Sequence, residues 1–192
     1  MTFKEIPKLV INLPARQDRL DAVTAQLTSH VFEVIPGVKE KPSHKGIGMA
    51  HANAIRYALD SNMPVVCIME DDCVLRVGFE AYLNEALNNL PEDWEILLGG
   101  VYEGQPMRHN SHWSKVGEFC GLHFYIVRHE VYQKILSEYD FKIHIDRWMN
   151  LRGDRFKCYV TSKFIATQSA GVSDNTGVYQ DYSHMIKSNL LL

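Results

Sequence analysis

The segment PVVCIMEDD, residues 64–72, decides the fold of this chain. Residues 65–69 form a continuous apolar run with β-branched side chains, which predicts a strand that is covered on both faces, as in a parallel sheet. Three acidic residues, Glu70, Asp71 and Asp72, follow this run directly. The segment therefore predicts a buried strand with a cluster of carboxylates at its carboxyl end.

Strand and helix patterns alternate on both sides of this segment. Residues 8–13 are an apolar run that ends at a proline, and apolar side chains then recur at helical spacing up to residue 29. Residues 31–35 form a short segment, and residues 36–46 lack periodicity and predict a loop. We expect further strands at 94–98, 119–127, 158–160 and 164–166, and helices at 20–29, from 47 to about 61, at 79–90, 130–139 and 145–151.

This alternation predicts an α/β layer fold, Rossmann-like, with a mainly parallel sheet flanked by helices. The 192 residues, of which 46% are hydrophobic, suit a single domain that spans residues 1–192. Ligands of such sheets bind outside the carboxyl ends of the strands. The polar segment 101–117 is long enough to be an active-site loop.

Composition excludes several classes of protein. The 20 Lys and Arg against 23 Asp and Glu leave no excess of positive charge for nucleic acid, so we expect no nucleic-acid partner. No apolar stretch is long enough for a membrane span or a signal peptide, so we expect a cytoplasmic protein. The cysteines lie in or beside apolar runs without zinc-site spacing, which favours reduced, buried thiols at Cys67, Cys73, Cys120 and Cys158.

The acidic triplet has the chemistry of a metal site. Side chains alternate along an extended segment, so Glu70 and Asp72 point to one side and Asp71 to the other. Hard divalent cations such as Mg²⁺ or Mn²⁺ prefer carboxylate oxygens, and they neutralise diphosphate leaving groups. The alternative is that these acids only cap a solvated loop, or cap the helix that begins near Gly78.

Three segments together resemble glycosyltransferase family 25, which includes lipopolysaccharide-core sugar transferases and collagen galactosyltransferases. They are VINLPARQDRL at 10–20, GIGMAHANAIRYAL at 46–59 and PVVCIMEDDCVL at 64–75, and looser similarity continues through 94–99, 121–128 and 144–148. The resemblance implies a glycosyltransferase A-type fold, a nucleotide-sugar donor that we expect to be a UDP-sugar, Mn²⁺ or Mg²⁺, and inversion at the anomeric carbon. One departure is Ala50, where many members have Ser before the motif histidine.

The same resemblance assigns candidate roles to individual residues. Glu70 and Asp72 are the expected metal ligands, and Asp146 is the expected catalytic base, because an inverting transfer needs a carboxylate to take the acceptor's proton. The expected donor-binding residues are Asn12, Arg16, Arg19, Gly46, His51 and Asp71.

Each of these residues also has an ordinary structural interpretation. The two arginines are alternatively solvated charges at a helix start, and Asn12 alternatively caps the turn. His51 lies on the apolar face of its helix, which favours a core histidine, and Gly46 and Gly48 are a weak signal for close approach of a ligand. Asp146 is alternatively a helix cap or a partner of Arg147, and core packing is slightly favoured over sugar stacking for Trp148. A further metal ligand or a lid would come from the C-terminal region, which contains Gln168, Asp174 and His184.

The sequence thus predicts a metal-dependent inverting hexosyltransferase that uses a nucleotide-sugar donor and a glycan or other hydroxyl acceptor. Two alternatives stay open. One is a catalytically silent module that binds sugar nucleotides or glycans. The other is a metal-dependent nucleotidyltransferase or phosphoesterase that uses the same acidic strand end.

Overall fold

The fold centres on one large sheet. A computed structural model of the protein describes residues 1–151, 155–174 and 177–182. The large sheet has eight strands, which are, in spatial order, β2 (Glu33–Pro36), β1 (Lys8–Asn12), β3 (Val65–Glu70), β10 (Phe124–Arg128), β5 (Ile96–Leu98), β11 (Cys158–Thr161), β8 (Trp113–Lys115) and β7 (Met107–Arg108). The helices are α1 (Gln17–Gln26), α2 (Ser43–Asp60), α3 (Phe79–Leu87), α4 (His129–Glu138) and α5 (Ile145–Met149). Short ladders pair β4 (Cys73–Leu75) with β12 (Ala166–Gln168), β6 (Glu103–Gly104) with β9 (Phe119–Cys120), and β13 (Gly171–Val172) with β14 (Tyr179–Gln180).

Most strands of the large sheet run in one direction. The parallel pairs are β1 with β2, β1 with β3, and β5 with β11, whereas β10 and β8 run against their neighbours. The predicted α/β fold with a mainly parallel sheet is therefore confirmed. The antiparallel strand β10 separates the two parallel parts of the sheet.

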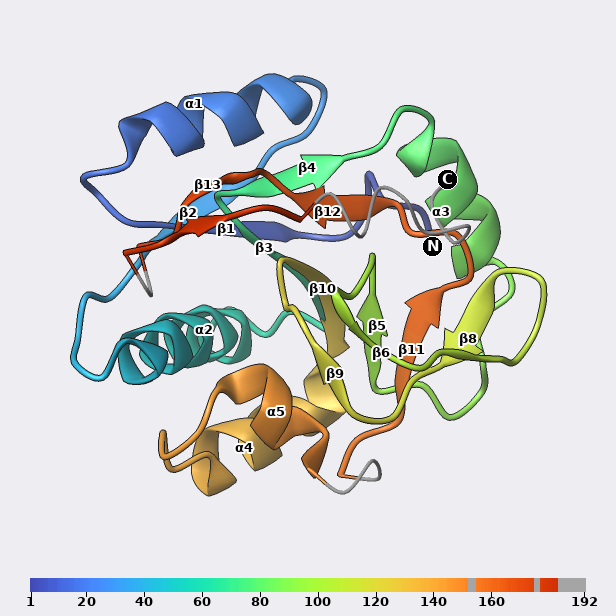
Figure 1. Ribbon diagram of the computed structural model, residues 1–192. Coiled ribbons are helices and arrows are strands. Elements are labelled where there is room, and N and C mark those ends of the chain that lie inside the picture. Colours follow the sequence, from blue (N-terminus) through green and yellow to red (C-terminus); the bar gives the residue numbers. More distant parts are fainter. Residues whose placement is uncertain (152–154, 175–176, 183–192) are drawn as a thin grey trace.

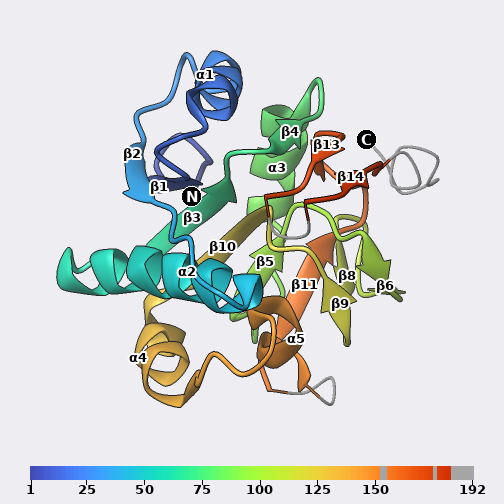
Figure 2. The same cartoon turned by 60° about the vertical axis from the view of Figure 1, so that its left-hand side comes forward.

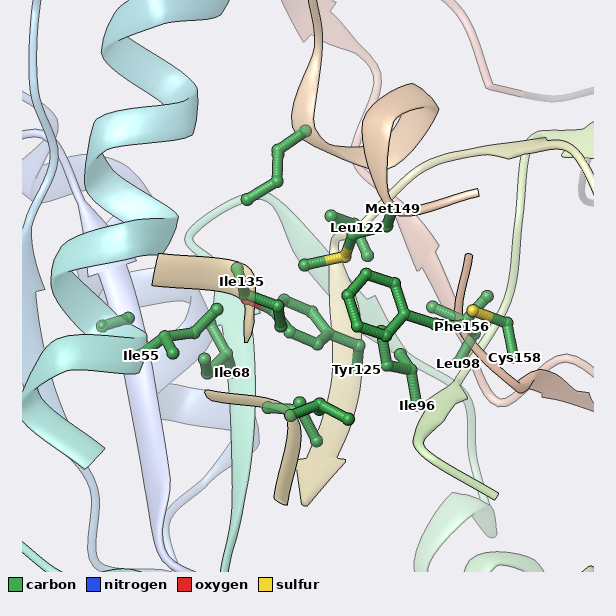
Figure 3. Packing of buried hydrophobic residues seen from close by; sticks show 14 of the residues in the cluster. Ile55, Ile68, Ile96, Leu98, Leu122, Tyr125, Ile135, Met149, Phe156 and Cys158 are labelled. Atoms are coloured by element: carbon green, nitrogen blue, oxygen red, sulfur yellow. The ribbon is translucent and has the colours of Figure 1, made fainter. Parts of the chain in front are cut away.

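Both faces of the sheet are covered by helices. In Figure 1, α1 and α3 lie on one face and α2, α4 and α5 on the other, and two clusters of buried side chains fill the two layers. Figure 3 shows Ile55 of α2 and Ile135 of α4 packed near Ile68 of β3 and Tyr125 of β10. Burial of each such aliphatic side chain contributes about 1.5–3 kcal/mol, which explains why a continuous apolar run forms the central strand.

Several predicted boundaries were wrong. The helix predicted from residue 47 begins at Ser43, because the Pro42 carbonyl accepts the Lys45 amide at 2.9 Å and draws the preceding polar residues into a first turn. The strand predicted at 119–127 is two strands, since Gly121 has a φ of 108° that interrupts the extended chain. Smaller differences are that α3 ends at Leu87, β5 begins at Ile96 and the strand expected at 164–166 lies at Ala166–Gln168.

The polar segment 101–117 is not one continuous loop. It contains β6, β7 and β8, and Trp113 within it is fully buried, with its indole N–H donating to the Ala86 carbonyl at 2.9 Å. The four cysteines are free and buried, as predicted. Among the described helices, none has the length and apolar character needed to cross a membrane.

Candidate active site at the carboxyl end of β3

A cavity of about 460 Å³ lies at the edge of the sheet where β1 and β3 end. Its walls come from the ends of these strands, from the loop before α2, from the loop at residues 121–122, from the start of α5 and from residues within 168–174 and 180–182. Because β10 runs antiparallel to β3, its beginning reaches the same edge. The cavity thus has the position expected for a ligand site in an open α/β sheet.

Glu70 and Asp72 converge in this cavity. The Gln168 side-chain amide Nε2 lies 3.2 Å from Glu70 Oε2 and 3.3 Å from Asp72 Oδ1. The β12–β4 ladder holds Gln168 opposite Cys73, next to Asp72. The two carboxylates therefore face one point, and they do so across the turn at residues 71–72 rather than along an extended strand.

Asp71 points to a different set of partners. Its Oδ2 accepts the side-chain amide of Asn12 at 2.8 Å, and its Oδ1 accepts Arg19 Nη1 at 3.2 Å. The same Arg19 nitrogen lies 3.1 Å from Asp72 Oδ2. Arg19 therefore links two of the three acids and lies on the cavity wall with them.

Burial is the largest single influence on the pKa of each acid in the triplet. Together with the neighbouring Glu70 carboxylate, burial raises the pKa of Asp72 to about 7. Burial also raises the pKa of Asp71, against the effect of Arg19. Burial opposes the ionisation of Glu70 as well, but its hydrogen bond with His51 and nearby positive charge hold its pKa below the ordinary value. The negative charge of Asp72 is therefore incompletely compensated, which favours an added cation beside it.

His51 is a buried histidine that holds Glu70. Its ring is on the inner face of α2, with Nε2 at 3.2 Å from Glu70 Oε1 and Nδ1 at 3.1 Å from the Tyr125 hydroxyl. The residue is 1% exposed yet contributes to the cavity wall. Both ring nitrogens are thus engaged, which fixes the orientation of the imidazole and of the carboxylate beside it.

Asp146 lies in the first turn of α5 and lines the same cavity as the acidic triplet. Its Oδ2 accepts the Gly121 amide at 3.0 Å and its Oδ1 accepts the Arg147 amide at 2.7 Å. The helix N-cap is His144, and the Arg147 guanidinium pairs with Glu103 at 2.6 Å. Asp146 is therefore neither the N-cap residue nor the hydrogen-bonded partner of the Arg147 guanidinium. Trp148, two residues on, is 4% exposed and belongs to the core, as favoured.

Three of the expected donor-binding residues do not line the cavity. Arg16 pairs with Asp18 at 2.9 Å and with Asp174, and Asn12 donates to the Arg16 carbonyl at 3.0 Å as well as to Asp71. Asn12 and Arg16 thus contact Asp71 and Asp174, which do line the cavity. Gly46 is buried in the first turns of α2, where a Cβ atom would lie 2.4 Å from the Val38 carbonyl oxygen.

We expect the change Gly46→Ala to destabilise the fold by about 1–3 kcal/mol, because the added methyl group overlaps backbone atoms of residues 38–40. Thermal unfolding of this variant measures the effect. The matched control is Gly171→Ala, where a Cβ atom meets nothing within 4 Å. A melting temperature for Gly46→Ala equal to that of the control would contradict this packing role.

Other cavity residues were foreseen less well. Gln168 and Asp174 do line the cavity, whereas His184 lies outside the described residues. Of segment 101–117, all of which the structure describes, Tyr102 alone contributes to the wall. Lys39 and Lys41 were missed, although their place just after β2 is a usable signal, since β2 is parallel to β1 and ends at the same sheet edge.

The oxygen ligands in the cavity are compatible with a hard cation that is bound by only two protein carboxylates. No group of three or more His, Cys, Asp or Glu side chains that could hold a metal occurs within the described part of the chain. However, Gln168 Oε1 is buried and lacks a hydrogen-bond partner among the described residues, beside two carboxylates that both accept from the Gln168 Nε2 amide group. Mg²⁺ in particular usually keeps several waters and binds one or two carboxylates plus substrate phosphates.

Comparison with known proteins identifies the fold. No protein-family model and no curated protein matches this chain. A mannose-1-phosphate geranyltransferase from Thermus thermophilus is similar in structure, with 10% identity and a TM-score of 0.52 over 83% of this chain and 74% of that one. A glycosyltransferase involved in glycosylation of the major capsid of PBCV-1 has 10% identity and a TM-score of 0.49 over 81% of this chain and 80% of that one. The similarity to the Thermus enzyme agrees with the α/β architecture built above.

Proposed function

We propose that this protein is a metal-dependent inverting glycosyltransferase, of the family 25 type, that transfers a hexose from a UDP-sugar to a hydroxyl group of a glycan or other acceptor. The observation that carries the proposal is the arrangement of carboxylates in one cavity. Glu70 and Asp72 converge at the end of β3, and Asp146 contributes a separate carboxylate from α5. This division supplies one site for a cation and another for a base.

Glu70 and Asp72 are the proposed ligands of Mn²⁺ or Mg²⁺. When bound there, the cation would neutralise the developing charge on the diphosphate leaving group. His51 and Tyr125 orient Glu70 through the hydrogen bonds described above, and Gln168 keeps Asp72 beside it. Such supporting hydrogen bonds fix the carboxylates before substrate arrives.

Asp146 is the proposed base. Two backbone N–H groups fix its carboxylate, and each oxygen retains a lone pair for the acceptor hydroxyl. In a single displacement the acceptor oxygen forms a bond to the anomeric carbon, the bond from that carbon to the diphosphate oxygen breaks, and Asp146 takes the hydroxyl proton. The products are the glycosylated acceptor and the nucleoside diphosphate.

Product identification tests this function. We expect Mn²⁺-dependent release of UDP from a UDP-sugar, slowly to water and faster to a suitable acceptor, and we expect EDTA to stop it. Release of pyrophosphate from a nucleoside triphosphate and a sugar 1-phosphate would instead identify a nucleotidyltransferase. Binding of UDP-sugars without turnover in the presence of an acceptor panel would identify a silent module.

The two arginines are expected to differ in their effect on donor binding. Arg19 lies on the cavity wall, where its guanidinium also donates to the Val172 carbonyl. Because Arg19→Ala removes a positively charged hydrogen-bond donor from the proposed donor site, we expect donor affinity to fall by about 1.5–3 kcal/mol. Arg16 itself does not line the cavity, and Arg16→Ala removes its exposed ion pairs with Asp18 and Asp174, so the loss should stay below about 1 kcal/mol. Calorimetric titration with UDP and Mn²⁺ compares them. Equal losses, or no loss with Arg19→Ala, would contradict this distinction.

A further inference from the structure

Two lysines form part of the cavity wall, and they lie in a segment of the chain that precedes the acidic triplet. Lys39 and Lys41 belong to the loop that follows β2 and precedes α2, and both are exposed residues that line the cavity. Glu40 lies between them and also lines the cavity, and one of its carboxylate oxygens accepts the Lys41 backbone amide at 3.2 Å. The loop therefore brings two lysines and one glutamate to the cavity wall.

These lysines differ from the other basic residues around the site. The guanidinium groups of Arg16, Arg19 and Arg147 each pair with at least one carboxylate. Across the ranges that the structure describes, neither Lys39 nor Lys41 forms an ion pair. Two lysines without an ion pair, against the single carboxylate of Glu40, leave an excess of positive charge at this wall, which favours an anionic ligand.

The lysine loop adjoins the start of α5, which carries Asp146. The rings of His44 and His144 lie 5.3 Å apart, so the beginnings of α2 and α5 are neighbours, as Figure 2 also shows. His144 is exposed, lines the cavity and precedes Asp146 by two residues. A ligand group held by the lysines would thus lie on the acceptor side of the site, near the proposed base.

We propose that Lys39, Lys41 and His144 form a subsite for a phosphate or carboxylate group of the acceptor, so that the acceptor is an anionic saccharide. This inference rests on the proposed function for its assignment to the acceptor. The diphosphate of the donor has its own place at Glu70 and Asp72, through the cation. The lysine subsite therefore holds a second anionic group, and its contribution falls with added salt because its cations are exposed.

Ligand titration by NMR tests the subsite with the full chain. The probes are glucose 6-phosphate and glucuronate, with neutral glucose as the matched sugar, each with and without saturating UDP and Mn²⁺. We expect at least one anionic probe to bind at least about tenfold more tightly than glucose, the gain expected from one charge-assisted hydrogen bond. Lys39→Gln combined with Lys41→Gln should remove this preference and leave UDP affinity within about twofold.

The control is Lys4→Gln combined with Lys163→Gln, which makes the same charge change at exposed lysines outside the cavity wall. This control should keep the preference for the anionic probe. If the variant with both Lys39→Gln and Lys41→Gln fails to fold, the two single changes replace it. Equal binding of all three sugars to the wild type would overturn the subsite. A double variant that loses UDP affinity and keeps the anion preference would overturn the acceptor assignment and give the lysines to the donor. Absence of UDP binding in the wild type would instead count against the proposed function, and the titrations without UDP judge the subsite separately.

Discussion

The change Asp146→Asn is expected to lower the rate of sugar transfer by about 10² to 10⁴ and to leave donor affinity nearly unchanged. The reason is chemical: an amide cannot take the proton of the acceptor hydroxyl, whereas the proposed donor site at Glu70 and Asp72 is unchanged. The Asn side chain has a single carbonyl oxygen, so it cannot replace both Asp146 oxygens as acceptors of the two backbone N–H groups. We therefore expect a stability loss of about 1 kcal/mol.

Transfer rate, UDP affinity and melting temperature, measured on one preparation, separate catalysis from stability. The matched control is Asp140→Asn, which removes an exposed carboxylate that pairs with Lys142 away from the cavity. The control should transfer sugar at the wild-type rate. If Asp146→Asn kept a rate within a few-fold of wild type at a temperature where it is folded, Asp146 would not be the base.

The change Asp72→Asn is expected to abolish metal-dependent nucleotide binding. Removing one of two carboxylates from the proposed cation site should raise the Kd for UDP in Mn²⁺ by at least about 30-fold, or about 2 kcal/mol. Burial and Glu70 raise the pKa of Asp72, so the metal-free variant should be at least as stable as the wild type. Mn²⁺ should then raise the melting temperature of the wild type and leave that of the variant unchanged.

Calorimetry with UDP, with and without Mn²⁺, measures the first effect and thermal unfolding the second. Asp21→Asn serves as the control, because Asp21 is exposed on α1 and accepts only the Gln17 side chain at 2.8 Å among the hydrogen bonds described. Unchanged nucleotide affinity and unchanged metal dependence in Asp72→Asn would contradict the assignment of the acidic triplet.

The architecture was predictable where burial dictates the pattern of side chains. The run at residues 65–69 is apolar at every position because β3 is covered on both faces, and the helices show their apolar stripes for the same reason. The reversed direction of β10 was not predictable, since a buried antiparallel strand has the same apolar composition as a parallel one. The break at Gly121 was missed because a positive φ leaves no periodic signal in the residues around it.

The site was predictable only as far as neighbours in sequence define it. Glu70 and Asp72 are two residues apart, so their proximity could be expected, although Asp71 and Asp72 form a turn between β3 and β4 rather than an extended segment. In contrast, the position of Gln168 depends on the β12–β4 ladder, which joins residues far apart in the chain. Arg16 and Arg19 cannot be distinguished in the sequence. In the tertiary fold Arg19 bonds Asp71 and Asp72 of the acidic triplet. Arg16 instead pairs with Asp18 and Asp174.

In the proposed complex a divalent cation joins the donor diphosphate to Glu70 and Asp72. Crystals grown with UDP and Mn²⁺ test it most directly, because anomalous scattering at the manganese edge locates the metal independently of the protein atoms. The expected result is an anomalous peak in contact with both carboxylates and with the diphosphate. UDP bound in the cavity with no such peak at Glu70 and Asp72, or a peak bound elsewhere on the chain, would contradict the claim.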